Sequence, residues 1–92
     1  MAVTVFDIDG VLADVRHRLH FLQRRPKDWP GFFAAAVDDP LLTTGGEAVH
    51  EAAASSRIIY VTGRPERCRQ DTATWLTGHD LPSGDLHMRP NR

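Results

Sequence analysis

Cysteine and long apolar runs are scarce in this 92-residue chain, and each scarcity excludes a class of protein. The single cysteine, Cys68, excludes an internal disulfide and a multi-cysteine zinc site, as is typical of a reducing cytoplasm. The first apolar run is broken by Asp7 and is too short for a signal peptide, and no later stretch approaches a membrane span. The sequence therefore predicts a cytoplasmic protein without a membrane segment.

Acidic residues are missing from one stretch, although the whole chain is nearly neutral. The net charge is −1, with 41% hydrophobic and 25% charged residues, which is ordinary for one small soluble domain and predicts no large nucleic-acid or membrane footprint. Residues 16–27 nevertheless contain five basic residues and two histidines without an acid. This run is either the solvated face of a helix or a contact surface for nucleic acid.

Strand-like and helix-like segments alternate along the chain, which predicts an α/β fold. β-branched and aromatic runs predict strands at 3–6 and 58–61, the second of them covered on both faces, and a third short strand at 85–88. Apolar residues at helical spacing predict four helices, over 15–22 with Asp14 as cap, 29–36, 44–55 with a Thr44–Glu47 capping box, and 65–77. We expect the first two helices to form a small insertion above the functional site, which is predicted at the carboxyl end of the first strand.

Two carboxylates directly follow the first predicted strand. Because side chains alternate along a strand, Asp7 and Asp9 can point the same way and share a cation, or divide the roles of nucleophile and acid/base. Functional groups of open α/β sheets gather at the carboxyl ends of parallel strands, and Gly10 allows a sharp turn there. The alternative is a strand end that carries two solvated acids.

A second motif, Thr62-Gly63-Arg64, ends the next predicted strand and opens a predicted helix. A hydroxyl, free backbone N–H groups and the positive end of a helix dipole would meet there and bind phosphate. Arg64 would contact a phosphate oxygen or point into solvent. With Asp7 as nucleophile and Asp9 as acid/base, this predicts phosphate-ester hydrolysis through an aspartyl phosphate, with Mg²⁺ bound by both carboxylates.

The motifs resemble those of the haloacid dehalogenase (HAD) superfamily of phosphatases, whose first motif is Asp-x-Asp-Gly and whose second is a Thr or Ser at a strand end. The chain is most similar to the phosphatase part of bacterial and phage polynucleotide kinase-phosphatases, and the similarity covers essentially all of it. The segments that carry it are 9–14, 17–19, 27–29, 32–33, 37–39, 61–66 and 88–90.

This resemblance implies a HAD-like Rossmannoid three-layer α/β sandwich with a parallel sheet. Residues 1–92 would be its N-terminal portion as one incomplete domain, with 15–40 as a small cap insertion. The implied activity is magnesium-dependent removal of phosphate from a nucleic-acid end, such as a 3'-phosphate, or from a nucleotide or another small ester. Asp7 would be the nucleophile, Asp9 the acid/base and a metal ligand through its backbone carbonyl, and Thr62 a phosphate contact.

Two further motifs of the superfamily have no convincing counterpart after Thr62: a Lys, sometimes Arg, that neutralises the phosphate, and one or two late Asp residues that hold magnesium. The only lysine, Lys27, precedes Thr62, and the last acid is Asp85. Without the later strands, one edge of the first strand would be unpaired, which invites self-association or pairing with a partner segment. The alternative to an enzyme is a non-catalytic piece that needs a partner to supply the missing groups.

Other residues with possible functions have ordinary structural explanations. Trp29, Phe32 and Phe33 recur at helical spacing, which favours packing over base stacking. Asp38 and Asp39 favour a turn over a metal site, and the histidines lack the spacing of zinc ligands.

Overall fold

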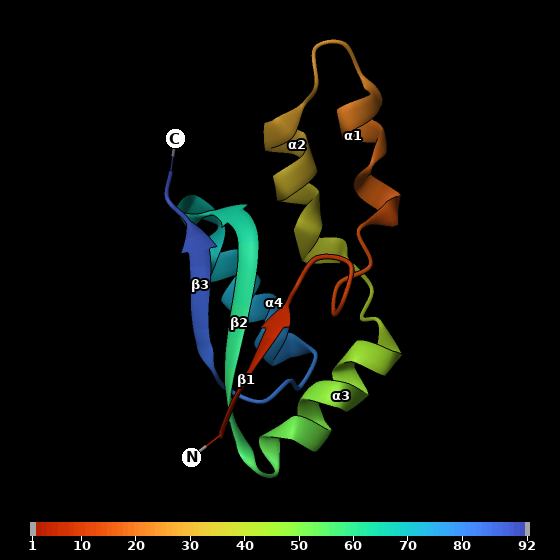
Figure 1. Ribbon diagram of the computed structural model, residues 1–92. Helices are drawn as coiled ribbons and strands as arrows, with labels where there is room; N and C mark the ends of the chain where they lie inside the picture. Colours follow the sequence, from red (N-terminus) through yellow and green to blue (C-terminus); the bar gives the residue numbers. More distant parts are fainter. Residues whose placement is uncertain (1, 92) are drawn as a thin grey trace.

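The computed structural model describes residues 2–91 and shows one parallel three-stranded sheet flanked by helices (Figure 1). The strands β1 (Ala2–Asp7), β2 (Ser56–Pro65) and β3 (Asp85–Arg89) lie in the order β1-β2-β3. Helix α3 (Thr43–Ala53) connects the first pair of strands, and a 3₁₀ turn η3 (Glu66–Cys68) with helix α4 (Arg69–Gly78) connects the second. The predicted α/β class and the three predicted strands are confirmed.

Between β1 and α3, a helical hairpin rises above the carboxyl ends of the strands (Figure 1). It consists of η1 (Arg16–Arg18), α1 (His20–Gln23), α2 (Trp29–Ala34) and η2 (Ala35–Asp38). The helix predicted over 15–22 is found as the two short pieces η1 and α1. Its expected apolar stripe is not buried, since Leu19 is 39% exposed, and the one buried side chain of η1 is Arg18.

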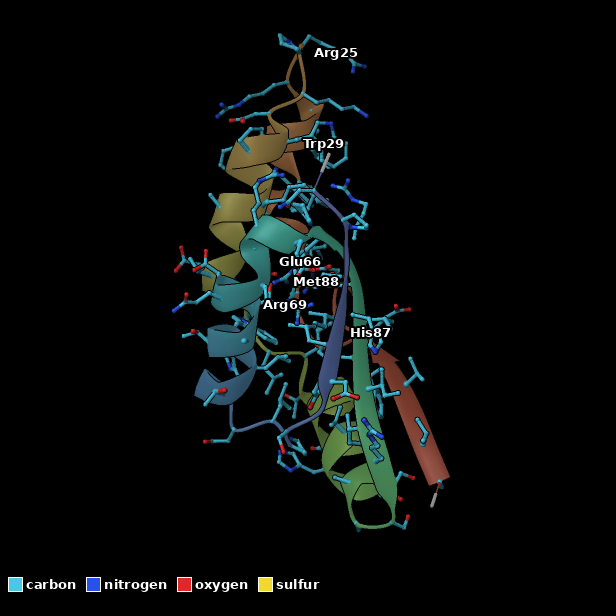
Figure 2. The ribbon with its side chains drawn as sticks, turned by 90° about the vertical axis from the view of Figure 1, so that its left-hand side faces the viewer. Arg25, Trp29, Glu66, Arg69, His87 and Met88 are labelled. Carbon is cyan, nitrogen blue, oxygen red and sulfur yellow. The ribbon has the colours of Figure 1, made fainter. Side chains whose placement is uncertain are left out.

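The hydrophobic core lies between one face of the sheet and the two helices α3 and α4. Phe6, Ile58 and Tyr60 contribute from the strands, Val49 from α3 and Trp75 from α4. Both helices lie on the same side, because both crossovers run between adjacent parallel strands in the same direction (Figure 2).

The opposite face of the sheet carries no helix within residues 2–91 (Figure 2). Val3 and Val5 of β1 are 52% and 56% exposed there, and Ile59 and Val61 of β2 are half-buried. The covering predicted for 58–61 is therefore found on one face only. A parallel strand is normally buried on both faces, so this exposed apolar surface is unusual.

In the described part of the chain, β1 forms one edge of the sheet, as the sequence predicted, and β3 forms the other. Self-association or pairing along that edge stays a prediction. Helices of residues 2–91 are all too short or too polar to cross a bilayer, and a cytoplasmic location also stays a prediction.

The start of α3 differs from the predicted capping box at Thr44. The helix begins at Thr43, and its N-cap residue, Leu42, makes no side-chain cap. The Leu42 backbone N–H donates to the Leu12 carbonyl at 2.7 Å, which fixes the chain two residues before the predicted cap. The first turn also approaches the loop after β1 closely, because a Cβ at Gly45 would lie 2.0 Å from the Val11 carbonyl oxygen.

Candidate active site

A tight loop after β1 places Asp9 above the carboxyl ends of β1 and β2. The backbone N–H groups of Leu12 and Ala13 both donate to the Ile8 carbonyl at 2.9 Å, so the chain folds back within five residues. Gly10 has a φ of +83°, a conformation that favours glycine and that makes this reversal possible. Asp9 therefore projects from a loop that is held by its own backbone hydrogen bonds.

The Asp9 carboxylate accepts hydrogen bonds from three side chains that are distant in sequence. Thr62 donates from its hydroxyl to Oδ2 at 2.7 Å. Arg64 donates to Oδ1 from Nε at 3.1 Å and from Nη2 at 2.8 Å. Arg18, from the helical hairpin, donates from Nη2 to the same oxygen at 2.9 Å. Four donors thus hold this carboxylate in one orientation.

A second carboxylate, Asp39, lies beneath the same two arginines at the end of η2. Arg18 donates from Nε to Asp39 Oδ1 and from Nη2 to Oδ2, each at 2.8 Å. Arg64 Nη2 lies 3.4 Å from Asp39 Oδ2, and His17 Nε2 lies 2.6 Å from Oδ1. We call Arg18, Arg64, Asp9 and Asp39 the buried charge cluster; of these four side chains only that of Asp9 is partly accessible, being 33% exposed.

Three members of this cluster are more deeply buried than the sequence suggested. Arg18 is 0% exposed, although it belongs to a basic run interpreted as a solvated or nucleic-acid-binding face. Arg64 is 2% exposed, which excludes the alternative that it points into solvent. Asp39 lies in a turn, as predicted, where its backbone N–H donates to the Ala36 carbonyl at 3.1 Å, but its side chain is buried. Each charge is buried because opposite charges surround it, which is the condition under which an ionised side chain tolerates burial.

Neighbouring groups hold the two arginines in place. The Phe32 ring lies 4.3 Å from the Arg18 guanidinium carbon, and its carbonyl accepts from Arg18 Nη1 at 3.3 Å. Thr72 of α4 accepts from Arg64 Nη1 at 3.2 Å. Helices from both sides of the strand ends therefore fix the orientation of the guanidinium groups.

The environment of Asp9 favours its ionised form. Burial raises the pKa of this carboxyl, but the hydrogen bonds and charge of Arg64, with further contributions from Thr62 and Arg18, outweigh it. The net pKa lies below the ordinary value of 3.8. Asp9 is therefore a carboxylate at neutral pH and could donate a proton only after an incoming anion draws the arginines away from it.

Asp7 has a different environment from Asp9. It is the last residue of β1, pairs in register with Val61 of β2, and is exposed. Within residues 2–91 its carboxylate takes part in none of the hydrogen bonds or ion pairs that fix Asp9. An exposed carboxylate without such partners is available to attack an incoming group.

The Thr62-Gly63-Arg64 motif does not open a helix, so the helix N-terminus predicted at these residues is not found there. These residues belong to β2, which continues to Pro65, and α4 begins only at Arg69. The extension is stabilised by pairing of Pro65 with Arg89 of β3 beyond an irregularity in the register. The motif therefore offers the Thr62 hydroxyl and the Arg64 guanidinium, but no helix dipole.

Oxygen donors of the type that magnesium prefers are present, but they are few. Asp7 offers a carboxylate, and the Asp9 carbonyl accepts none of the hydrogen bonds found among the described residues. The Asp9 carboxylate already binds two guanidinium groups, which would repel a cation. Residues 2–91 contain no cluster of three or more acidic, His or Cys side chains suited to a metal. The donor type fits magnesium, and the remaining positions would fall to phosphate and water.

Sequence reasoning missed Arg18 and Asp39 as members of the site. A signal was present, since a basic run at 16–27 and the acids at 38–39 flank one predicted insertion. What the sequence did not show is which of five basic residues in that run turns inward.

Comparisons of sequence with known proteins find only partial matches. No protein-family model matches the chain. Mouse membrane-associated phosphatidylinositol transfer protein 3 is 37% identical over 60 residues, which are 59% of this chain and 6% of that protein. The human membrane-associated phosphatidylinositol transfer protein 2 is 40% identical over 60 residues, again 59% of this chain and 4% of that protein. The chain thus spans a very small part of these curated relatives.

Comparison of structures matches almost the whole chain. A chain of the Pnkp1/Rnl/Hen1 complex superposes with a TM-score of 0.77 over 99% of this chain and 28% of that one, at 23% identity. A chain of the Pnkp1/Rnl/Hen1 RNA repair complex gives a TM-score of 0.76 over 97% of this chain and 25% of that one, also at 23% identity. At this identity the likeness shows that the fold is shared.

Proposed function

We propose that this chain contributes a HAD-type phosphatase site that hydrolyses phosphate monoesters through an aspartyl phosphate on Asp7. The observation that carries the proposal is the convergence of the Thr62 hydroxyl and two guanidinium groups, from Arg18 and Arg64, on Asp9, two residues after the exposed Asp7 at the end of β1. Donors arranged around one anion can be shared with a second anion, the phosphate, at the same strand ends.

In the first step, an Asp7 carboxylate oxygen attacks phosphorus, and the bond from phosphorus to the ester oxygen breaks. The pKa of Asp9 rises when phosphate competes for Arg64 and Arg18, so that Asp9 takes up a proton from solvent as the substrate binds and gives it to the leaving oxygen. In the second step, Asp9 takes a proton from water, the water oxygen attacks phosphorus, and the bond to Asp7 breaks to release phosphate. The site residues Thr62, Gly63 and Arg64 would orient the phosphoryl oxygens throughout, Gly63 because its small size leaves room beside the strand end.

Magnesium is part of this proposal, with Asp7 and the Asp9 carbonyl as its protein ligands. When bound, it would offset the repulsion between the Asp7 carboxylate and the phosphate. The buried charge cluster provides little of that compensation, because its two cationic side chains are already balanced by two carboxylates.

A phosphorylated nucleic-acid end, such as a 3'-phosphate, is the proposed substrate, with a nucleotide or another small ester as the alternative. The support is that the fold is shared with a chain of an RNA repair complex. The chain spans about a quarter of that protein, so the activity of the whole protein carries over only as a proposal.

Hydrolysis of an aryl phosphate tests the chemistry without testing the substrate. We expect magnesium-dependent release of phosphate, reduced on the order of 10³-fold or more by Asp7→Asn, which removes the nucleophile. Asp80→Asn is the matched control, because Asp80 is exposed in the loop that leads into the amino end of β3. Equal rates for the Asp7→Asn variant and the unmodified chain would exclude Asp7 as nucleophile.

A second candidate is a non-catalytic piece that works only with a partner segment. The exposed edge of β1 and the internal balance of charge in the cluster both favour it. A chain that stays monomeric in sedimentation and still shows magnesium-dependent turnover would exclude this second candidate.

A further inference from the structure

A groove opens between the helical hairpin and the ends of β2 and β3. It has a volume of about 500 Å³ and is lined by Trp29 and Phe33 of α2, Gly63 of β2, Arg67 of η3 and Arg89 of β3. Volumes in this range are typical of sites for small organic groups. Figure 2 shows Trp29 close to the upper end of β3, where the groove lies.

One wall of the groove is aromatic. The rings of Trp29 and Phe33 lie at 26° to each other with centroids 5.9 Å apart, and Trp29 remains 46% exposed. Neither ring belongs to the hydrophobic core. The third aromatic residue of α2, Phe32, instead covers Arg18 of the charge cluster. Phe32 also contacts both groove rings, with its centroid 5.9 Å from that of Trp29 and 5.3 Å from that of Phe33. Phe33 is half-buried in this aromatic cluster, and Trp29 is its exposed ring.

The other walls are basic and carry no acid. The Arg67 guanidinium carbon lies 6.0 Å from the Phe33 ring centroid. Arg89 donates from Nε to the Gly63 carbonyl at 3.0 Å, which fixes its side chain across the strand ends. Lys27 Nζ lies 6.0 Å from the Trp29 ring centroid. Flat aromatic rings beside arginines match a nucleobase with an adjacent phosphodiester.

The groove joins the proposed phosphate site through β2. Gly63 lines the groove, and the preceding residue, Thr62, donates its hydroxyl to Asp9. The organic group that is esterified to a phosphate bound at Thr62 would therefore extend directly into the groove. An aryl phosphate would occupy the phosphate site with only one ring beyond it.

We infer that this groove binds the unpaired terminal nucleoside of a single-stranded nucleic acid, with its base on Trp29 and Phe33 and the next phosphodiester between Arg67 and Arg89. The inference rests on the proposed function, because it takes the terminal phosphate to lie between Asp7 and Thr62. A base paired in a blunt duplex is stacked on its neighbour and cannot lie on Trp29, so single-stranded ends are preferred.

Calorimetric binding to the Asp7→Asn chain tests this inference without turnover. The ligands are a single-stranded tetranucleotide with a 3'-phosphate, the same strand with an abasic terminal sugar, and a blunt duplex of the same sequence. We expect the intact single strand to bind about 10-fold more tightly than the other two, in line with base stacking on an aromatic side chain. Ribose and deoxyribose forms distinguish RNA from DNA, and a stacking site is expected to accept both.

Substitution of the aromatic wall isolates the contact. Trp29→Leu is expected to reduce the preference for the intact end over the abasic end to less than about 2-fold, and Trp29→Phe to retain most of it, because Phe keeps a ring. Arg69→Ala is the control for charge, since Arg69 is exposed, pairs with Glu66 and does not line the groove.

Two results would overturn the inference: equal affinity for intact and abasic ends, or a preference that Trp29→Leu leaves unchanged. The outcomes separate it from the proposed function. If the chain cleaves aryl phosphate but binds both ends equally, the groove inference fails and the function stands. If the chain shows the Trp29-dependent preference but releases no phosphate, the function fails and the groove site stands.

Discussion

The helices α3 and α4, on one face of the sheet, contact the strands in a different way from the helical hairpin, which lies above the carboxyl ends of the strands. α3 and α4 pack apolar side chains such as Val49 and Trp75 against Ile58 and Tyr60. The hairpin reaches the strand ends through Arg18 and Asp39, which pair with Asp9 and Arg64. It also contacts α4, because the Trp75 indole N–H donates to the Asp39 carbonyl at 2.8 Å. Its own aromatic residues lie outside the core. The lower half of the molecule, which is the sheet with α3 and α4, is therefore held by apolar packing. The position of the upper half, which is the hairpin, depends on buried charge and polar contacts.

This difference matters for the site, because Asp9 belongs to the lower half and Arg18 to the upper half. The ion pair between them sets the distance from the hairpin to the strand ends. The groove beside Trp29 has walls from both halves as well. Loss of the buried charge cluster should therefore disturb the site and the groove before it disturbs the sheet.

The largest expected effect is that of Arg18→Ala. This change leaves Asp39 buried without its main partner, and breaking a buried ion pair typically costs about 3 to 5 kcal/mol. The measurement is the free energy of unfolding in urea. Arg16→Ala is the control, because the Arg16 side chain is 81% exposed and its ion pair is with the neighbouring Asp14. Arg18→Lys, which keeps the charge but loses the forked geometry, should fall between the two. Equal losses of stability for Arg16→Ala and Arg18→Ala would contradict the conclusion that Arg18 forms a stabilising buried ion pair.

A smaller effect on the free energy of unfolding is expected when an isoleucine is shortened to valine on either face of β2. Ile58 is 2% exposed beneath the helices, and Ile59 is half-buried on the open face. Ile58→Val should destabilise the chain by about 1 kcal/mol through a lost methylene group, and Ile59→Val by clearly less. Urea unfolding at low and high salt measures both, and neither loss should depend on salt. Similar losses at the two positions would show that the second face is covered in solution.

The smallest expected effect is the contribution of Asp9 to stability in acid. Its pKa is lower in the folded chain than the ordinary value of 3.8, so the unfolded chain binds this proton more readily. The stabilisation is fully present above 3.8 and is lost as the pH falls through the lower folded pKa. Between about pH 6 and about pH 3, Asp9→Asn should therefore lose less stability than the unmodified chain. An identical pH dependence of stability for both chains would show that ionisation of Asp9 does not stabilise the fold.

Local patterns were sufficient for the strands and for part of the site. The β-branched runs placed β1 and β2, and Asp9, just after β1, meets Thr62, near the carboxyl end of β2, in one site as expected. The same patterns failed where the chain beyond a strand end is set by distant contacts. β2 extends to Pro65 because it pairs with Arg89, and no local feature of Thr62 or Gly63 reveals that partner.

The sequence by itself determined the alternation of strands and helices, the carboxylates at 7 and 9, and the hydroxyl and guanidinium of the second motif. Only the tertiary structure decided that Arg18 and Asp39 belong to the same cluster. The physical reason is separation along the chain: Asp39 lies 21 residues from Arg18 and 25 from Arg64. Periodicity reports which side chains share a face of one element, whereas the partner of a buried charge depends on how the elements fold together.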